Sequence, residues 1–341
     1  MIGALLPLVA VFALQLEPLP DAAFARPTGQ IRARAASACE LVMMDADGRV
    51  LARAAAPAGE LDLAALLPTL RDIPSAVRVQ AVVAGVPTDA PLVVVPLLGR
   101  PTIRTIQDVR PDGKTKFTRI IGWGDQLLDP ANAAHVEAKR TWSKEDPAPR
   151  SGFRVAVDMD VLFDTSAGAM RFAMRPEVAP NTARNFVELA ASGFYDGTII
   201  HRVVPKGRGG TPFVIQGGDP IGTGDGGPGY DIALEPSTLA HDFGVLSMAR
   251  NDWPDSAGSQ WFVGLTRAET ARLDGQYCAF GEAIEGAEAI ITTERGAIAD
   301  AETGRPVNPV VVKRATVMPA AAWTPGSGRV ARRVVRPEAV K

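Results

Sequence analysis

Short apolar runs separated by Gly, Pro and Asp dominate the chain between residues 38 and 125. In "CELVMMDADGRVLARAA" two such runs surround Asp47-Gly48, and in "PTIRTIQDVRPDGKTKFTRIIGW" two surround Pro111-Asp112-Gly113. Apolar runs on either side of Asp-Gly predict a β-hairpin. Within this stretch only "ELDLAALLPTLRDI" favours a helix. We therefore predict a small β-rich domain, a sandwich or a barrel, over residues 26–129.

A second series of apolar runs begins at Gly152. "VLFDTSAGAMRFAMRP" predicts two strands, and "NPVVVKRATVMP" predicts a strand near the end of the series. Between them, "APNTARNFVELAAS" has apolar residues at the i, i+3, i+4 and i+7 spacing of an amphipathic helix, and "GAEAII" predicts a shorter helix. The pattern predicts a mainly β second domain over residues 152–318.

Three segments depart from the globular pattern. "ALLPLVAVFALQL" is an apolar run of signal-peptide length, and Ala23-Phe24-Ala25 offers an A-x-A cleavage site. Residues 1–25 therefore predict a signal peptide and export to a periplasm, although a buried apolar N-terminus is the alternative because the segment has no Lys or Arg. Residues 130–151 are polar and contain Pro, as in a linker. Residues 319–341 are rich in Arg and predict a basic, disordered tail, or alternatively a segment that binds an anionic surface.

Composition adds few constraints. The 341 residues carry a formal net charge of −2, and 46% are hydrophobic. This length predicts more than one domain, and the near-neutral charge gives no field that would favour nucleic acid. Cys39 and Cys278 are the only cysteines, and neither lies in a C-x-x-C or a metal-ligand spacing. We expect two free thiols, no metal and no cofactor; whether the thiols oxidise after export stays open.

The stretch "QGGDPIGTGDGGPGYDIALEP" contains G-x-G-x-x-G at Gly222, Gly224 and Gly227. A dinucleotide-binding loop needs a helix that begins on these glycines. Here Gly-Pro-Gly-Tyr and then "DIALEP" follow, without the pattern of an amphipathic helix. We therefore expect no bound nucleotide, and glycines that shape a loop with unusual backbone angles.

Five segments occur in the order "YDGTIIHRVV", "FVIQGGDP", "GVLSMAR", "SAGSQWFVG" and "LDGQYCAFGEAIEG". In these segments the chain resembles the cyclophilin-type peptidyl-prolyl cis-trans isomerases, over residues 155–318; "GTGDGGPGY" and "SMAR" resemble the bacterial branch of that family. The resemblance implies a closed eight-stranded antiparallel β-barrel capped by two helices. It also implies an enzyme, a rotamase, that isomerises X-Pro bonds of proline-containing peptides without a cofactor.

The resemblance also assigns roles to residues. Arg202 matches the catalytic arginine of the family, a permanent charge whose donors would stabilise a twisted amide. Val214 stands where the family usually has Met, and Trp261 is expected in the core. The residues expected to bind the proline ring or the substrate backbone are Phe213, Val214, Gln216, Ala249, Gln260, Phe262, Leu273 and Tyr277.

Three departures from the family pattern bear on the site. "HRVVPKGRGGTPF" has extra residues, among them Lys206 and Arg208, so the rim of the pocket is expected to differ. Arg272 replaces a tryptophan that is associated with cyclosporin binding, which predicts weak or no binding of that drug. The longer "ARNDWPDSAGSQ" leaves the register at Arg250 and Asn251 open.

Other candidate chemistry lacks a supporting pattern. Prolyl isomerisation transfers no proton to a leaving group, so His201 is expected to be structural. His135 and His241 lie in no motif with a carboxylate or a cysteine. Ser259 has no G-x-S-x-G context, and no hydrolase is predicted.

Two hypotheses follow for the whole chain. The leading one is an exported isomerase that acts on folding proteins. The alternative is a proline-peptide binding module or chaperone with little turnover. In either case the N-terminal domain would recruit client proteins or bind a partner in the cell envelope.

Overall fold

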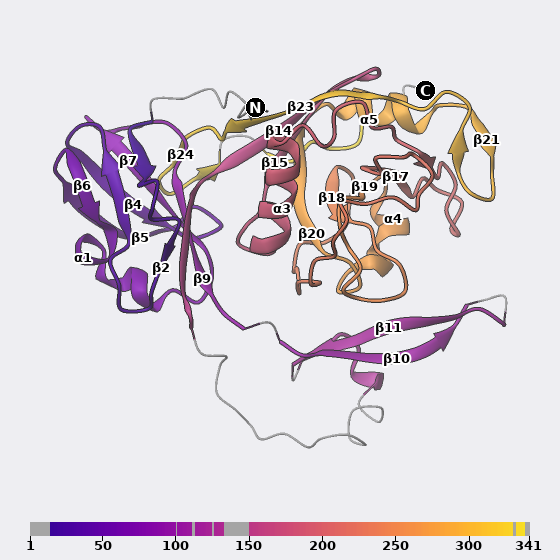
Figure 1. The fold of residues 1–341 in the computed structure, drawn as a ribbon, viewed down its shortest axis with the longest axis horizontal. Helices are drawn as coiled ribbons and strands as arrows, with labels where there is room; N and C mark the ends of the chain where they lie inside the picture. The colour runs from indigo at the N-terminus through magenta and orange to yellow at the C-terminus, as the bar shows by residue number, and fades with distance from the viewer. Residues whose placement is uncertain are drawn as a thin grey trace, which may run out of the picture.

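The computed structural model describes residues 14–99, 101–110, 113–124, 126–132, 150–329 and 332–337. The fold is mainly β, with short helices. Figure 1 shows two β-rich domains side by side, with a long hairpin (β10 and β11) beneath the second domain. No helix within these ranges is long and apolar enough to cross a membrane.

The N-terminal domain consists of two antiparallel sheets that share one apolar core. The order of the larger sheet is β2 (Phe24–Ala25), β13 (Gly152–Val157), β9 (Leu92–Leu97), β7 (Val77–Val83), β4 (Cys39–Met44) and β5 (Val50–Ala56), with β8 (Val86–Pro87) beside β7. The smaller sheet contains β1 (Leu16–Pro18), β3 (Arg32–Ala35) and β6 (Gly59–Asp62). Core side chains from both sheets include Leu16, Ile31, Leu41, Val79 and Phe153.

Two local predictions in this domain are confirmed. β4 and β5 pair on either side of Asp47-Gly48, where Gly48 has a φ of +81° that favours glycine. The predicted helix forms as α1 (Leu63–Leu66), and the Asp62 side chain caps it by accepting from the Ala64 amide. A 3₁₀ turn, η1 (Pro68–Asp72), follows because Pro68 has no amide to continue the α-helix.

Residues 14–25 differ from the predicted signal peptide because they belong to this domain. β1 pairs with β3, and Leu16 lies in the core with 2% of its surface exposed. β2, at the predicted cleavage site, pairs with β13. Cleavage after Ala25 would remove both strands, so that cleavage position does not fit the fold. Residues 1–13 lie outside the described residues.

An eight-stranded antiparallel sheet forms the second domain. Its order is β16 (Arg202–Val203), β17 (Val214–Gly217), β19 (Trp261–Gly264), β18 (Val245–Met248), β20 (Ala279–Glu285), β15 (Gly168–Met174), β14 (Met159–Thr165) and β23 (Val312–Pro319). The segment before β16 reaches β23, since the amides of Gly197 and Ile200 donate to the carbonyls of Val312 and Val310 at 2.8 Å. The sheet is therefore curled until its edges meet through this segment, although β16 and β23 themselves do not pair in the described chain.

Two helices cover the curled sheet. α3 (Pro180–Ala191) and α5 (Ala287–Glu294) occupy the two stretches for which the sequence predicts helices. α3 begins on a proline, at the position where a missing amide costs no hydrogen bond. Phe186 of α3 belongs to an aromatic core. Its ring centroid lies 5.8 Å from that of Phe163, 5.1 Å from that of Tyr195 and 5.0 Å from that of Phe280.

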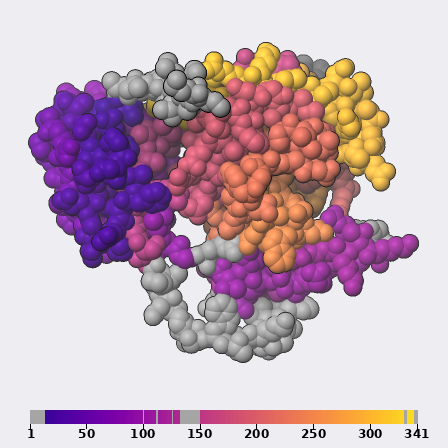
Figure 2. All heavy atoms as spheres, viewed as in Figure 1, coloured from indigo at the N-terminus to yellow at the C-terminus, as the bar shows by residue number. Residues whose placement is uncertain are grey.

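The hairpin of β10 (Ile103–Val109) and β11 (Lys116–Trp123) packs against the second domain (Figures 1 and 2). The Gln276 side chain donates to the Ile120 carbonyl at 2.6 Å and accepts from the Ile120 amide at 3.0 Å. Ile120 and Trp123 lie in the core of the second domain, and the Trp123 indole donates to the Gly275 carbonyl at 3.3 Å. The sequence predicts this hairpin as part of the N-terminal domain. The structure instead buries the apolar end of the hairpin against the second domain.

The change of domain also differs from the predicted boundary at residue 152. β13 pairs with β9 from Gly152 opposite Leu97 to Val157 opposite Leu92, within the larger N-terminal sheet. β14 then enters the second domain, so the change falls at Asp158. The two strands follow one another with only Asp158 between them, and their similar patterns do not show which sheet each joins.

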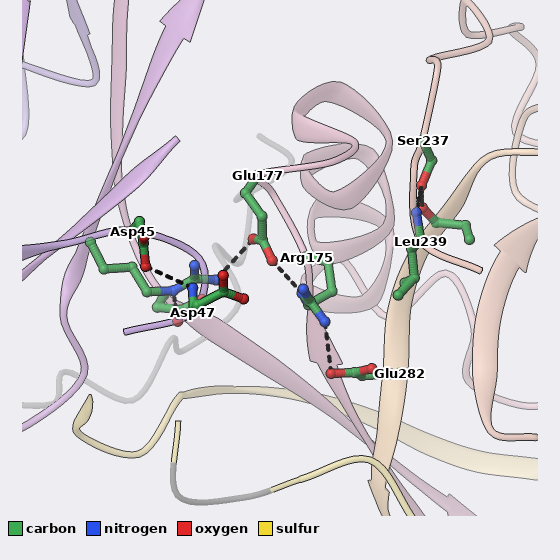
Figure 3. A network of polar contacts seen from close by, with 10 residues as sticks. Asp45, Asp47, Arg175, Glu177, Ser237, Leu239 and Glu282 are labelled. Atoms are coloured by element: carbon green, nitrogen blue, oxygen red, sulfur yellow. Dashed lines mark hydrogen bonds and ion pairs between the residues drawn. The ribbon is translucent and has the colours of Figure 1, made fainter. Parts of the chain in front are cut away.

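A buried group of charges connects the domains at this crossing. Arg78 on β7 is 0% exposed and contacts Asp158 at 2.8 Å and Glu177 at 3.1 Å. Arg175 lies between Glu177 and Glu282 of the second domain (Figure 3). Paired, hydrogen-bonded charges are the form in which such groups are tolerated away from water.

The segment after Pro319 differs from the predicted disordered tail within residues 320–329 and 332–337. β24 (Trp323–Thr324) and β25 (Gly328–Arg329) form a short hairpin. Trp323 is 3% exposed, and its ring centre lies 4.0 Å from the Arg78 guanidinium. Arg336 forms a bidentate pair with Glu294 at 2.7 and 2.8 Å. The segment is ordered because its indole is buried and its arginines find carboxylates.

Acid should weaken the junction between the domains. Burial raises the pKa of Glu177, but Arg78 and Arg175 outweigh this effect and lower the pKa from 4.5 to about 2. The unfolded chain therefore takes up this proton at a higher pH than the folded one. The contribution of Glu177 to the free energy of unfolding is complete above pH 4.5 and is lost as the pH falls towards 2. Urea unfolding between pH 4.5 and 2 should show the fall in the free energy of unfolding, and Glu177→Gln should make this free energy depend less on pH. The same pH dependence in the variant and the unmodified protein would contradict the assignment to Glu177.

The two thiols should react at different rates. Burial raises the pKa of the Cys278 thiol to about 12, and the neighbouring Glu235 adds to the effect. Because the thiolate is the reactive form, Cys278 should stay unlabelled in the native protein at neutral pH, whereas the partly exposed Cys39 is labelled. Mass spectrometry should count one label before unfolding and two after it. Rapid native labelling that disappears in Cys278→Ser would show that this core opens easily.

Candidate active site

Pairing across three strands brings predicted site residues to one face of the sheet. Arg202 on β16 lies opposite Gln216 on β17, and Gln216 lies opposite Phe262 on β19. Directly opposed residues of an antiparallel pair share a face. The period of two along a strand adds Val214 to the same face as Gln216. Strand register therefore assembles residues that lie far apart in the sequence.

A hollow of about 610 Å³, the apolar hollow, opens on this face. Val214, Phe262 and Leu273 form its floor; each is at most 5% exposed, and they pack together. Leu273 comes from η3 (Ala271–Leu273), which follows α4 (Arg267–Thr270). The other predicted residues that line the hollow are Arg202, Phe213, Gln216, Ala249 and Tyr277. Of the predicted residues, only Gln260 lies elsewhere, in an adjoining hollow.

Arg202 lies at the edge of the apolar hollow and keeps its charge unpaired. Its Nη1 donates to the Gln216 side-chain oxygen at 3.1 Å, and no carboxylate within the described residues pairs with it. Burial lowers the pKa of Arg202 below its ordinary value, but a guanidinium remains charged at neutral pH. Its other donors are available to a ligand.

Gln216 and Gln260 connect the apolar hollow to the glycine-rich loop. The Gln216 amide donates to the Gln260 oxygen at 3.0 Å, and the Gln260 amide donates to the carbonyls of Gly224 and Gly226 at 2.8 and 2.9 Å. The adjoining hollow has about 600 Å³ and shares Gln216, Ala249 and Arg250 with the first. An extended peptide can therefore lie across both.

The glycine-rich loop is organised around a carboxylate of the chain itself. Asp219 is 0% exposed and accepts from the amides of Ile221 at 2.8 Å and Gly224 at 2.5 Å. Gly222 and Gly224 have φ values of +71° and +98°, and a β-carbon on Gly226 would lie 2.0 Å from an Asp219 oxygen. Amides that a dinucleotide-binding loop would direct at phosphate are thus used by Asp219.

His241 differs from the expectation that it lacks polar partners. Its Nδ1 lies 3.0 Å from Asp274 and its Nε2 lies 2.9 Å from the Ser247 hydroxyl. This is the connectivity of a catalytic triad, but Ser247 is 0% exposed on β18, so no substrate reaches its oxygen. The imidazole stacks on Phe262 with centroids 5.8 Å apart, and the group fixes the floor of the apolar hollow.

Of the remaining polar candidates, His201 lies outside both hollows, and Ser259 lines the adjoining hollow. His201 is 8% exposed, and burial lowers its pKa, so the ring is neutral near pH 7. The Ser259 hydroxyl is buried and donates to the Gly218 carbonyl at 2.7 Å. His135 lies outside the described residues. Nowhere in the described ranges are three or more His, Cys, Asp or Glu side chains grouped to hold a metal.

The sequence predicts no site role for four residues that also line the apolar hollow, namely Val204, Gly207, Arg250 and Arg110. Arg250, whose register was open, lines both hollows, with its guanidinium 4.8 Å from the centre of the Tyr277 ring. Arg110 reaches the hollow from the β10–β11 hairpin. The apolar end of β11 indicates that the hairpin packs against another part of the chain. No feature of the sequence around Arg110 indicates that this part is the apolar hollow.

The fold and the hollow define a class: β-rich proteins with an arginine at the edge of a hollow whose floor is apolar. A model of the family "Cyclophilin type peptidyl-prolyl cis-trans isomerase/CLD" matches residues 160–317. The chain is 38% identical over 164 residues to "Peptidyl-prolyl cis-trans isomerase-like 1" of Aspergillus fumigatus, which covers 47% of this chain and 95% of the relative. A peptidyl-prolyl cis-trans isomerase of Schizosaccharomyces pombe is 37% identical over 164 residues, with coverages of 47% and 99%.

The chain belongs to the cyclophilin-type peptidyl-prolyl cis-trans isomerase family, and it is an isomerase of X-Pro bonds. A solved cyclophilin of Cryptosporidium parvum, crystallised in the presence of the dipeptide Ala-Pro, is 32% identical, with a TM-score of 0.42 over 47% of this chain and 98% of that one. These relatives are eukaryotic, so the likeness to the bacterial branch stays a prediction.

Arg272 should make this isomerase insensitive to cyclosporin. The guanidinium lies 4.2 Å from the centre of the Phe213 ring and places a charge where the family often has an indole. Arg272→Trp should raise the affinity for the drug about tenfold or more, because an indole offers a large apolar surface and one donor. Fluorescence titration measures this, with Lys313→Trp on β23 as the control for an added indole. Nanomolar affinity of the unmodified protein would refute the prediction.

Proposed function

We propose that the enzyme holds the proline ring in the apolar hollow while Arg202 donates to the twisted amide. The planar amide resists rotation with a barrier of about 18–20 kcal/mol, although cis and trans X-Pro differ by only about 0.5–1 kcal/mol. No covalent bond has to form or break. The twisted amide loses conjugation and its nitrogen becomes a better acceptor, so a fixed donor stabilises the transition state more than either ground state.

One observation carries the proposal: Arg202 lies at the edge of an apolar floor and pairs with no carboxylate of the described chain. The hydrogen bond to Gln216 orients the guanidinium before a substrate arrives, which reduces the entropy cost of alignment. The floor of Val214, Phe262 and Leu273 suits a pyrrolidine ring because it presents apolar side chains. Tyr277 packs edge-on against Phe262, with centroids 5.6 Å apart, and supports that floor.

Exchange NMR on a short Ala-Pro peptide tests this function without a coupling protease. Uncatalysed exchange takes tens to hundreds of seconds. We expect catalytic amounts of the protein to accelerate it strongly. A binding module or chaperone would instead shift the peptide resonances in proportion to the amount of protein and leave the exchange rate unchanged. That outcome would overturn the mechanism.

We also propose that the protein is exported and acts on folding proteins outside the cytoplasm, with a signal that ends before Leu16. The apolar run includes Ala13, whose small side chain suits a cleavage site, and the glycine-rich loop resembles the bacterial branch. Leu16 must be retained because it is buried in the core. Mass spectrometry of the protein from its own cell envelope should find an N-terminus at or before Leu16. An intact chain in the cytoplasm would overturn the proposal.

A further inference from the structure

Basic side chains surround the mouth of the apolar hollow. Besides Arg202, five of them line it, and no carboxylate of the described chain does; these five, the cationic rim, are Arg110, Lys206, Arg208, Arg250 and Arg272. We propose that the cationic rim selects substrates that carry an acidic side chain next to proline. The inference rests on the isomerase function proposed above and names the class of peptide that its site prefers.

The chain itself neutralises the rim only in part. Within the described residues, Lys206, Arg208, Arg250 and Arg272 form no ion pair. Arg250 donates to main-chain carbonyls, and Arg272 lies over the face of an aromatic ring. Burial lowers the pKa of Arg272 and the positive charge of Arg208 lowers it further, whereas the nearby Glu269 carboxylate raises it. Arg208 and Arg272 are thus close enough to repel each other, and neither is bonded to a carboxylate of the described chain.

Two carboxylates lie near the rim, and neither fills its mouth. Glu269 is 4% exposed beneath the extra loop, where it accepts from the Gly209 amide at 2.5 Å. Asp252 lies 3.5 Å from Arg110, and both side chains are about half exposed. An exposed pair of this kind is weak and exchanges readily for another carboxylate.

The rim is assembled from segments that lie far apart in the sequence. Lys206 and Arg208 belong to the extra residues between β16 and β17, a loop closed by the hydrogen bond from the Gly207 amide to the Thr211 carbonyl at 2.7 Å. Arg110 directly follows β10, in a hairpin that lies outside residues 160–317, where the family match falls. Arg272 stands on η3. These segments add positive charge to the same opening.

A carboxylate beside proline would enter the combined field of these cations. One exposed ion pair changes an affinity by less than about fivefold, so several together predict a preference of about tenfold at low salt. Screening by salt should remove most of it. The adjoining hollow contains Asp225 and Asp231, so the preference should appear on one side of the proline only. A rim around one small hollow suits a peptide better than a nucleic acid, which needs a continuous basic track.

Exchange NMR with matched peptides tests the inference. The peptides carry Glu, Gln or Lys near proline, on one side or the other, and kcat/KM is measured at low and at high salt. When the varied residue lies on one side of the proline, we expect kcat/KM for the Glu peptide to exceed that for the Gln peptide about tenfold, and kcat/KM for the Lys peptide to be lower than both. High salt should bring the three values of kcat/KM together. The double variant Lys206→Gln/Arg208→Gln, and separately Arg272→Gln, should lower the Glu-to-Gln ratio at least about threefold. Lys313→Gln, which removes an exposed cation paired with Asp164 on the sheet, should leave the ratio unchanged.

The outcomes separate this inference from the function on which it rests. Efficient turnover of the Gln peptide with a ratio near one overturns the rim's role and leaves the isomerase mechanism intact. An equal fall of the Glu-to-Gln ratio in Lys313→Gln would show that the preference follows the net charge of the protein, and it would also overturn the rim's role. Stronger competition by a single-stranded oligonucleotide than by the Glu peptide, at equal salt, would make the rim a nucleic-acid surface instead. Absence of turnover with every peptide would overturn the proposed function itself.

Discussion

Arg202→Ala should lower kcat for an Ala-Pro peptide by about 100- to 1,000-fold, the usual loss when one preorganised donor to a transition state is removed. The KM should change little, because the apolar floor of Val214, Phe262 and Leu273 still binds the proline ring. This split between kcat and KM identifies a group that acts mainly on the twisted amide. Exchange NMR at several peptide concentrations measures both quantities.

Two further variants keep that prediction interpretable. Arg202→Lys retains a positive charge but loses the planar array of donors, so it should recover only part of the rate. Arg184→Ala, which removes an arginine from an exposed pair with Glu188 on α3, should not reproduce the loss. Equal rates for the unmodified protein and Arg202→Ala would remove the arginine from the mechanism and favour a binding module.

Arg78→Met should lower the free energy of unfolding by about 3–5 kcal/mol, the range found when one partner of a buried ion pair is removed. The substitution leaves the Asp158 carboxylate buried without the 2.8 Å contact that now compensates it. It also removes the cation that lies 4.0 Å from the Trp323 ring. Urea unfolding followed by circular dichroism and by tryptophan fluorescence should show an earlier transition by both probes.

The matched control is an arginine in an exposed pair. Arg34→Met removes a contact of 3.5 Å with Glu60 between side chains that are about half exposed, and it should cost less than about 1 kcal/mol. Adding Asp158→Asn to Arg78→Met should restore part of the lost stability, because it removes the uncompensated charge. A double variant no more stable than Arg78→Met would attribute the loss to packing alone.

Local signals in the sequence predicted most of the elements and much of the site. Asp47-Gly48 located a hairpin because its backbone angles require glycine, and the apolar spacing located α3 (Pro180–Ala191). The five family-like segments contain most of the residues that line the apolar hollow, although Val204 and Arg250 within them carried no predicted role; Arg110, the extra loop and Arg272 come from other parts of the chain. Gln260, which is predicted to bind the substrate backbone, also donates its side-chain amide to the glycine-rich loop, and its substrate role stays a prediction.

Contacts between distant segments could not be predicted in this way. In "VRVQAVV" Arg78 and Gln80 alternate with valines, so one face of β7 (Val77–Val83) carries polar side chains. That face is covered by Trp323, whose amide donates to the Gln80 side chain at 2.7 Å. A periodic pattern shows that a face is polar, but it does not show which remote segment satisfies it. The docking of Ile120 and Trp123 escaped prediction for the same reason.

The course of β13 has a practical consequence for anyone who divides this protein to express its halves. A product that stops at residue 150 would leave β9 as a bare edge, with its backbone amides and carbonyls open to any passing strand. A product that starts at residue 151 would contain β13 without its partner strand β9, and it would expose the indole of Trp323 that is buried in the whole protein. Aggregation of either fragment would then result from dividing the sheet between β9 and β13. It would not show whether each domain has an independent function.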